Sequence, residues 1–304
     1  MNISKKALMS VIMALTSLIA MAQPHYHVMK RDGSNLTEEA TSDAKTYKIR
    51  VDMDEPKPKD AIGGKITIEM GSGCNTSPLK HSFYFTKKGN VYYDFYADKL
   101  FFEKSQLDYP RGWYDMSHCG HFLWGKSITD CISSPGKKEY LDLGWPKARE
   151  KDFYFANPDN LPRLQEDLGN EKWAVLSYCE WDYVLENLGE SGWLVDGETC
   201  YLIDTTPGKS LLSELHRKKK GKISRLSIEE FKSLEAKGLV CLPASGVRIA
   251  NEFYDIGGGG HYWSCTPADD NTAYSPLFDL SGSGMNHSGY RGTGGAVRLV
   301  ILAD

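Results

Sequence analysis

The stretch SIEEFKSLEAKGLVCLPASGVRI, residues 227–249, decides the fold because it joins a helix to a strand. Ser227 and Glu230 form a capping box, in which the serine hydroxyl and the glutamate carboxylate each accept a backbone N–H at the helix start. Apolar side chains then recur every three residues and predict one buried helix face: Ile228, Phe231 and Leu234. Gly238 is typical of the left-handed residue that follows a helix, so the apolar run LVCLP after it is predicted to be a strand.

Three further strand-like runs follow: GGGGHYWSCTP, AYSPLFDLSGSG and GGAVRLVILA, which begin at residues 257, 273 and 294. Each is bounded by Gly, Pro, Asp or Asn, the pattern of strands separated by turns. An earlier capping box, Ser177 with Glu180, opens a second helix, and Asp196-Gly197 predicts a hairpin turn after it. Two capped helices in an otherwise strand-rich chain predict the α+β class, with both helices packed on mainly antiparallel sheets.

Several segments, taken in order, resemble a known family. They are KLFFEKSQLDY (99–109), GWYDMSHCGHFLWGKS (112–127), WAVLSYCEWDYVLENL (173–188), FKSLEAKGLVCLPASGVR (231–248), HYWSCTP (261–267) and AVRLV (296–300). Over roughly residues 82–304 the chain resembles exported bacterial proteins of the major-paralogous-domain (FISUMP-like) type, a branch of the C-type-lectin-like superfamily. The resemblance implies a C-type-lectin-like domain exposed at a surface for recognition.

The same fold hosts formylglycine-generating enzymes and retroelement-diversified variable proteins, so the resemblance does not by itself decide the function. The chain also departs from the family pattern in three places. Cys265 stands where a second serine commonly follows YWS, Cys241 replaces the usual apolar residue, and SHCGHF (117–122) replaces a plainer loop. These departures leave the fold expectation intact but put shared loop chemistry in doubt.

The first 22 residues are predicted to be a signal peptide. Lys5 and Lys6 form its charged start, Ala7–Ile19 its apolar stretch and Ala20–Ala22 its cleavage motif. The apolar run is shorter than the ~20 residues that span a bilayer, so we expect an exported chain without a transmembrane segment. It would reach the cell surface, the periplasm or the medium. Residues 23–80 are expected to be a polar arm (23–45) and a strand-rich extension before a domain at 81–304, and the sequence leaves open whether strands from 46–80 join the sheet of that domain.

Composition narrows the classes of partner. The formal net charge of −4 and the pI of about 6.1 give no basic footprint for nucleic acid. The seven cysteines are an odd number, so at least one is unpaired in a monomer. Cys119 and Cys131 are close enough in sequence to close a short loop, but the pairing cannot be read from spacing. Cys241 fits a small buried residue as well as a disulfide partner.

Two C-terminal segments, PADDN (267–271) and SGSGMNHSGYRGTGG (281–295), are predicted to be exposed loops. Tyrosine gives flat contact area, and Ser, Gly and Asn adapt their hydrogen bonds, which is the chemistry of a binding loop. The alternative is that both segments are only solvated turns. The expected ligand contacts are His261, Asp269, Asp270, Asn271, Asn286, His287, Tyr290 and Arg291.

Metal sites receive less support from the sequence. Asp269, Asp270 and Asn271 supply oxygens for calcium, but three adjacent residues cannot all face one ion without a second loop. The Glu-Pro-Asn, Gln-Pro-Asp and Trp-Asn-Asp motifs of sugar-binding C-type lectins do not occur in the chain. His118-Cys119-x-His121 resembles part of a zinc site but lacks a fourth ligand. We therefore expect no metal and no cofactor.

The leading hypothesis is a non-catalytic protein that recognises a glycan or a protein through its C-terminal loops. An enzyme of the formylglycine-generating type, with Cys241 and Cys265 as reactive thiols, is the alternative, and a structural part of a surface assembly is the third. The basic run RKKKGK (217–222) is read as part of a solvated loop spanning 205–225. Trp263 and Arg298 are read as structural. Ligand identity and oligomeric state stay open.

Overall fold

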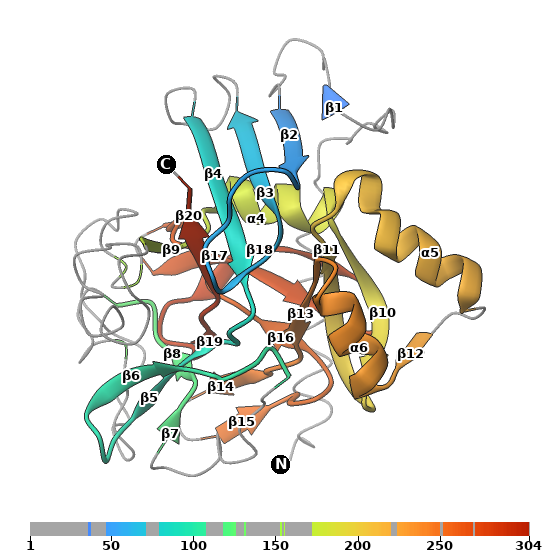
Figure 1. Cartoon of the computed structure of the whole chain (residues 1–304). Helices are drawn as coiled ribbons and strands as arrows, with labels where there is room; N and C mark the ends of the chain where they lie inside the picture. The colour runs from blue at the N-terminus through green and yellow to red at the C-terminus, as the bar shows by residue number, and fades with distance from the viewer. Residues whose placement is uncertain are drawn as a thin grey trace.

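The computed structural model describes residues 36–37, 47–70, 79–107, 118–125, 131, 153, 155, 172–219, 224–249, 252–269 and 271–303. The predicted signal peptide lies outside the described residues, as does most of the predicted polar arm. Within them the chain is a strand-rich α+β protein with short helices on mainly antiparallel sheets (Figure 1). No described helix combines the length and the apolar character that a membrane crossing needs.

A six-stranded antiparallel sheet includes the last strand of the described chain. Its strands, in spatial order, are β1 (Leu36–Thr37), β2 (Tyr47–Asp52), β3 (Ala61–Met70), β4 (Leu79–Thr86), β20 (Leu299–Leu302) and β9 (Trp173–Val175). Ile62, Ile66 and Ile68 of β3 belong to the same buried cluster as Phe83 and Phe85 of β4. The described strands before residue 81 therefore belong to the same sheet as β20 and β9, a possibility that the sequence left open, and residue 81 itself lies within β4.

Both predicted capping boxes form. They start α4 (Tyr178–Asn187) after Ser177 and α6 (Ile228–Glu235) after Ser227. In each case the serine side chain accepts the backbone N–H of the glutamate three residues on, and that glutamate accepts the serine N–H. On the predicted apolar face of α6, Phe231 is fully buried and its two neighbours are half-buried. Local capping therefore fixes where these helices begin, as the sequence predicts.

A third described helix corrects the expectation of two helices. Residues 205–225, predicted to be a polar loop, contain a short 3₁₀ turn (Pro207–Lys209) and α5 (Ser210–Lys218). The helix buries three leucines on one face, Leu211, Leu212 and Leu215. Basic residues fill its last turn, where they suit the negative end of the helix dipole. This helix was not predicted from the sequence because the segment is polar, no side-chain cap marks the helix start and only three of its residues are buried.

A second sheet lies beneath α5 and α6, which stand together on one side of the molecule (Figure 1). Its strands, in spatial order, are β12 (Ser224–Leu226), β10 (Gly189–Val195), β11 (Glu198–Asp204) and β13 (Leu239–Pro243). The predicted turn at Asp196-Gly197 joins β10 to β11, with φ angles of 52° and 88°. β12 runs parallel to β10, and the other neighbours are antiparallel.

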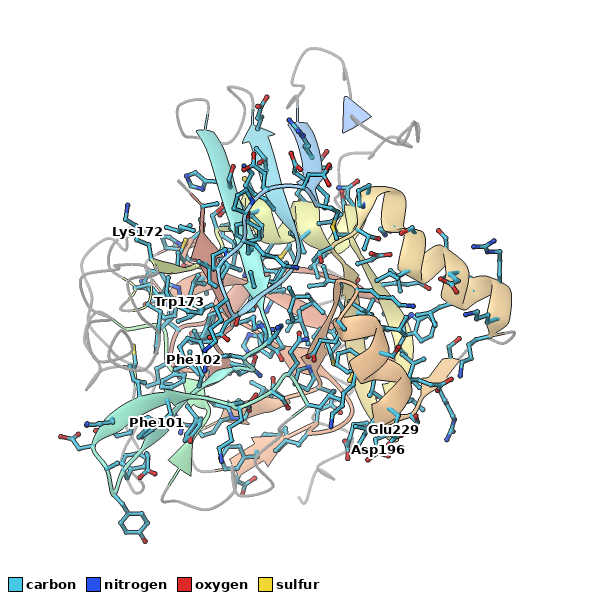
Figure 2. All side chains as sticks on the ribbon, in the orientation of Figure 1. Phe101, Phe102, Lys172, Trp173, Asp196 and Glu229 are labelled. Carbon is cyan, nitrogen blue, oxygen red and sulfur yellow. The ribbon has the colours of Figure 1, made fainter. Side chains whose placement is uncertain are left out.

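Smaller sheets complete the described fold. They consist of β5 (Val91–Asp94), β6 (Lys99–Phe102) and β7 (His118–Cys119); β8 (His121–Phe122) and β19 (Gly295–Ala296); β14 (Val247–Ile249) and β15 (Glu252–Tyr254); and β16 (Gly260–His261), β17 (Thr272–Phe278) and β18 (Ser283–Tyr290). The ring centroids of Phe102 and Trp173 are 4.9 Å apart, so β6 packs against β9 of the large sheet (Figure 2).

Arg298 of the AVRLV motif is completely buried between β19 and β20. Its Nη2 donates to the carbonyl of Thr86 at 2.8 Å and to Oε1 of Gln106 at 2.9 Å. Gln106 also accepts the backbone N–H of Cys241 at 3.0 Å and donates to Glu235 at 2.7 Å. The arginine therefore has the structural role that the sequence predicts, but inside the core and not as an ordinary polar position of an alternating strand.

Candidate functional site

The hairpin of β17 and β18 carries most of the candidate contact residues. The strand β18 corrects the prediction that residues 281–295 form one long exposed loop. Asp279 closes the hairpin turn, because its Oδ1 accepts the backbone N–H of Ser281 at 2.6 Å. Glycine and serine indicated a loop by composition, yet the backbone of this segment pairs along most of β17. The candidate residues are therefore presented by a sheet and by the ends of its strands.

One face of the hairpin packs on α4 and on the central core. The ring centroid of Tyr274 lies 4.3 Å from that of Tyr178, the first residue of α4. The ring of Phe278 lies 5.4 Å from that of Tyr201 on β11. Aromatic contacts of this kind bury a large area and favour specific geometries, so they hold the hairpin in one position on the domain.

Three predicted contact residues lie at the open end of the hairpin and face solvent. Asp269 and Asn271 are exposed, and Tyr290 is 52% exposed opposite Thr272. Asp269 Oδ1 accepts the backbone N–H groups of Asn271 at 2.7 Å and of Thr272 at 2.8 Å. Partial burial acts to raise the pKa of Asp269, but these hydrogen bonds outweigh it and hold the pKa below its usual value. The residue therefore presents a carboxylate at neutral pH.

Arg291 supports this end of the hairpin from below. It is only 2% exposed, so its side chain lies inside the protein and not at the surface, where the sequence analysis placed it. Its Nη2 donates to the carbonyl of Asp269 at 3.2 Å, and its backbone N–H donates to the carbonyl of Asn271 at 3.0 Å. The guanidinium lies 5.4 Å from the ring centroid of Trp124, and the backbone N–H of Trp124 donates to the carbonyl of Arg291 at 3.0 Å. Hydrogen bonds from Arg291 therefore hold the backbone of Asp269 and Asn271, whose side chains are exposed, in a fixed position.

The remaining predicted contacts are not part of this end group. His261 is 6% exposed and pairs with Leu277, five residues and about 17 Å along the strand from Thr272. Asn286 is half-buried opposite Ser275. The side chain of His287, on β18, and the whole of Asp270 lie outside the described residues. Of the six predicted residues whose side chains are described, Asp269, Asn271 and Tyr290 thus form an exposed end group, Arg291 is buried beneath them, and His261 and Asn286 lie farther along the sheet.

Neither metal-site interpretation gains support. Among the described residues there is no group of three or more His, Cys, Asp or Glu side chains placed to hold an ion. His121 is fully buried and its Nε2 lies 2.6 Å from the carbonyl oxygen of Ser245. Burial lowers the pKa of His121 to about 3, and the positive charge of Arg248 adds to the effect. The side chains of His118 and Cys119 lie outside the described part of the chain.

Cys241 and Cys265, the two thiols of the enzyme alternative, lie in different parts of the described core. Cys241 is fully buried beneath α5 and α6, whereas Cys265 packs on a different core cluster. Burial, and then the neighbouring thiol of Cys200, raise the pKa of Cys241 well above its usual value, which disfavours the nucleophilic thiolate. Cys131 is buried and is not in a disulfide, so it does not close a loop with Cys119, a pairing that the sequence left open; Cys179 is disulfide-bonded.

The described lysines of the basic run are paired with acidic side chains. Lys218 Nζ lies 2.6 Å from Glu214, and Lys219 Nζ lies 2.8 Å from Glu230 at the start of α6. Surface pairs of this kind add little stability, but they reduce the positive field that would attract a polyanion. The contacts agree with the interpretation of this run as a solvated surface.

Sequence reasoning passed over two residues that shape this region. Trp124, beneath Arg291, carries no local signal, because the two residues meet only through the fold. Ser275 was detectable, since the period-two pattern of AYSPLF places it on the strand face opposite Tyr274 and Phe278. Comparison with protein-family models, curated proteins and solved structures finds no match for the chain.

Proposed function

We propose that the chain is an exported, non-catalytic binding protein that recognises a glycan or a protein through the open end of the β17–β18 hairpin. The observation that carries this proposal is the buried Arg291 beneath the exposed Asp269, Asn271 and Tyr290. A carboxylate, an amide and an aromatic ring held on a fixed backbone lose little conformational entropy when a ligand binds. Binding residues on a rigid scaffold are typical of recognition proteins.

The proposal includes a C-type-lectin-like fold, which the motif order implies and the topology supports. The final strand β20 lies between β4, near the start of the domain, and β9, which leads directly into α4. The two ends of the domain therefore adjoin in one sheet. After α6 the chain continues through β13 into the paired strands that carry the candidate contacts, in the order of the sequence motifs.

The side chains at the open end of the β17–β18 hairpin favour a binding function over a catalytic one. Its groups are a stabilised carboxylate, an amide and a phenol, with no activated nucleophile or paired acid and base among the described residues there. The carboxylate of Asp269 is engaged by backbone N–H groups, which suits a fixed hydrogen-bond acceptor better than a proton-transfer group.

The test is binding of the chain from residue 23 onward to an array of bacterial and animal glycans and extracellular-matrix proteins. The double variant Tyr290→Ala/Asn271→Ala should lose about tenfold or more in affinity with an unchanged Tm, because both side chains are exposed. Tyr96→Ala is the matched control, since Tyr96 is 86% exposed in the separate β5–β6 turn and should bind as the unmodified chain does. Equal binding by the double variant would refute this site and favour a structural role.

A further inference from the structure

Three tyrosines lie on one face of the β17–β18 hairpin, beside its open end. Tyr290 lies opposite Thr272, and opposite residues of antiparallel strands share a face. Tyr274 follows Thr272 by two residues, so its side chain lies on this face too. Its ring meets that of Tyr178, the first residue of α4, with 4.3 Å between the ring centroids. We call Tyr290, Tyr274 and Tyr178 the tyrosine row, because they lead from the hairpin end onto α4.

A ligand can reach the tyrosine row from solvent. Tyr290 is 52% exposed, and both other tyrosines are half-buried. Tyr290 and Tyr274 are diagonal neighbours across two strands, a separation of about 7–8 Å that aromatic side chains can bridge. A single exposed apolar side chain needs no explanation, but an apolar patch with polar residues at its rim is typical of an interaction site. The row has such a rim in the exposed Asp269 and Asn271.

Thr266 fixes two members of the tyrosine row. Its Oγ1 accepts the backbone N–H of Tyr178 at 3.0 Å, and its carbonyl accepts the backbone N–H of Tyr274 at 3.0 Å. A second link joins the same segments, because the backbone N–H of Cys265 donates to the carbonyl of Leu176 at 3.1 Å. The start of α4 is therefore held against β17 in the free chain. Aromatic rings that are already in position lose little conformational entropy when a ligand binds.

The described charges near the tyrosine row favour a neutral ligand. Asp269 is an exposed carboxylate, and Nη2 of the buried Arg291 donates to the carbonyl of the same residue at 3.2 Å. A positive charge therefore lies beneath the negative one. Glu180, in the first turn of α4, is 4% exposed, and its Oε1 lies 2.7 Å from Nδ1 of His81. Each described carboxylate here has a basic group beside it, so the net field that would attract an ion is small.

Aromatic rings next to hydrogen-bond acceptors suit a sugar ring. The C–H groups on one face of a hexose pack on an aromatic ring, and its hydroxyls donate hydrogen bonds to acceptors at the rim. Asp269 and Asn271 supply a carboxylate and an amide oxygen as acceptors, and each phenol of the row both donates and accepts. A protein partner usually covers about 800 Å² on each side of an interface. One or two sugar rings need only a few aromatic side chains, so this small set of groups favours a glycan over a protein.

We propose that the tyrosine row binds a neutral glycan, with Tyr178 and Tyr274 as specificity-determining contacts. The rings supply the apolar contact, and Asp269 and Asn271 accept hydrogen bonds from the sugar hydroxyls. The inference rests on the proposed binding function and deepens it, because it selects one of two ligand classes and extends the site from the hairpin onto α4. Neither Tyr178 nor Tyr274 is among the contacts expected from the sequence.

The test is NMR titration with methyl glycosides of glucose, galactose, mannose and N-acetylglucosamine. Tyr178→Ala and Tyr274→Ala should each bind about tenfold more weakly, whereas Tyr178→Phe and Tyr274→Phe should stay within about threefold, because the aromatic face remains. Tyr254→Ala is the matched control, since Tyr254 is half-buried on the separate β14–β15 hairpin and should leave binding unchanged. In the unmodified chain, saturation of the aromatic protons should transfer mainly to the protons on one face of the bound sugar. This readout needs no substitution, so it holds even if an alanine variant fails to fold.

The outcomes separate this inference from the proposed function. Glycoside binding that is kept in Tyr178→Ala and Tyr274→Ala but lost in Tyr290→Ala/Asn271→Ala would reject the tyrosine row and leave the hairpin end as the site. Binding of a matrix protein, but of none of the glycosides, would overturn the glycan class and keep the proposed function. Equal saturation of both sugar faces would contradict packing on the rings. Tighter binding of a methyl glucuronide, which is anionic, would contradict a neutral ligand.

Discussion

The free energy of unfolding should fall as the pH is lowered from 7 to 5, because two histidines are buried in the neutral form. Burial, with the charge of Arg248 in second place, lowers the pKa of His121 to about 3, and burial lowers that of His261 to about 4. In the unfolded chain both have a pKa near 6.5. The unfolded state then binds more protons below that pH, so stability present above pH 6.5 is lost as the pH falls toward the folded values.

The size of the effect follows from these pKa values. At pH 5 each histidine is protonated in the unfolded chain and neutral in the folded one. An interval of about 1.5 pH units below the unfolded pKa is worth about 2 kcal/mol per histidine, or about 4 kcal/mol for both. Glu180 and Asp269 have pKa values below their ordinary 4.5 and 3.8, so their loss of charge begins at lower pH and does not obscure this window.

Urea unfolding at pH 7, 6 and 5 measures the loss directly. The His261→Phe variant should lose about half as much stability as the unmodified chain over this range. A double variant, His121→Phe/His261→Phe, should be nearly independent of pH between 7 and 5, whatever its absolute stability. If the unmodified chain and His261→Phe lost the same free energy, the imidazole of His261 would take up a proton freely in the folded state and the reasoning would be refuted.

Replacing Arg298 with Met should lower the free energy of unfolding by about 1–3 kcal/mol in urea, because it removes the side-chain donor to the carbonyl of Thr86 and one of the two donors to Gln106 Oε1. A loss under about 1 kcal/mol would show that these groups find other partners. Ser177→Ala and Ser227→Ala should each cost about 1 kcal/mol by removing a helix cap. The fall in Tm should be greater for Ser177→Ala, whose hydroxyl also binds the buried Glu180 carboxylate at 2.7 Å; equal falls would contradict this.

Local signals predicted local structure. The two capping boxes and the turn at Asp196-Gly197 each depend on hydrogen bonds and φ angles within about four residues, so a short stretch of sequence is enough to define them. The helix Ser210–Lys218 was not predicted from the sequence, because it has no side-chain cap. Its leucines are held by packing on a sheet whose strands come from other parts of the chain. The strand Ser283–Tyr290 was not predicted either, because its glycines and serines have little strand propensity. Its extended conformation depends on pairing with β17.

The candidate contacts show the same division. Sequence placed Asp269, Asn271 and Tyr290 on the surface, and the structure shows them exposed at one end of a hairpin. Sequence also offered Arg291 and His261 as surface contacts, and both are buried. Nothing within a few residues of either side chain distinguishes it from an exposed one, because burial depends on what other segments place over it.

By itself the sequence determined the α+β class, the start of two helices, the hairpin at Asp196-Gly197 and the chemistry available near the C-terminus. Only the tertiary structure decided which polar groups are exposed, which brace the backbone and which stay unpaired. Arg298 illustrates the reason, since it meets its carbonyl partner on Thr86 across 212 residues of chain. Hydrogen bonding and burial of a charged or polar side chain depend on such distant partners, whereas a cap or a turn depends on its immediate neighbours.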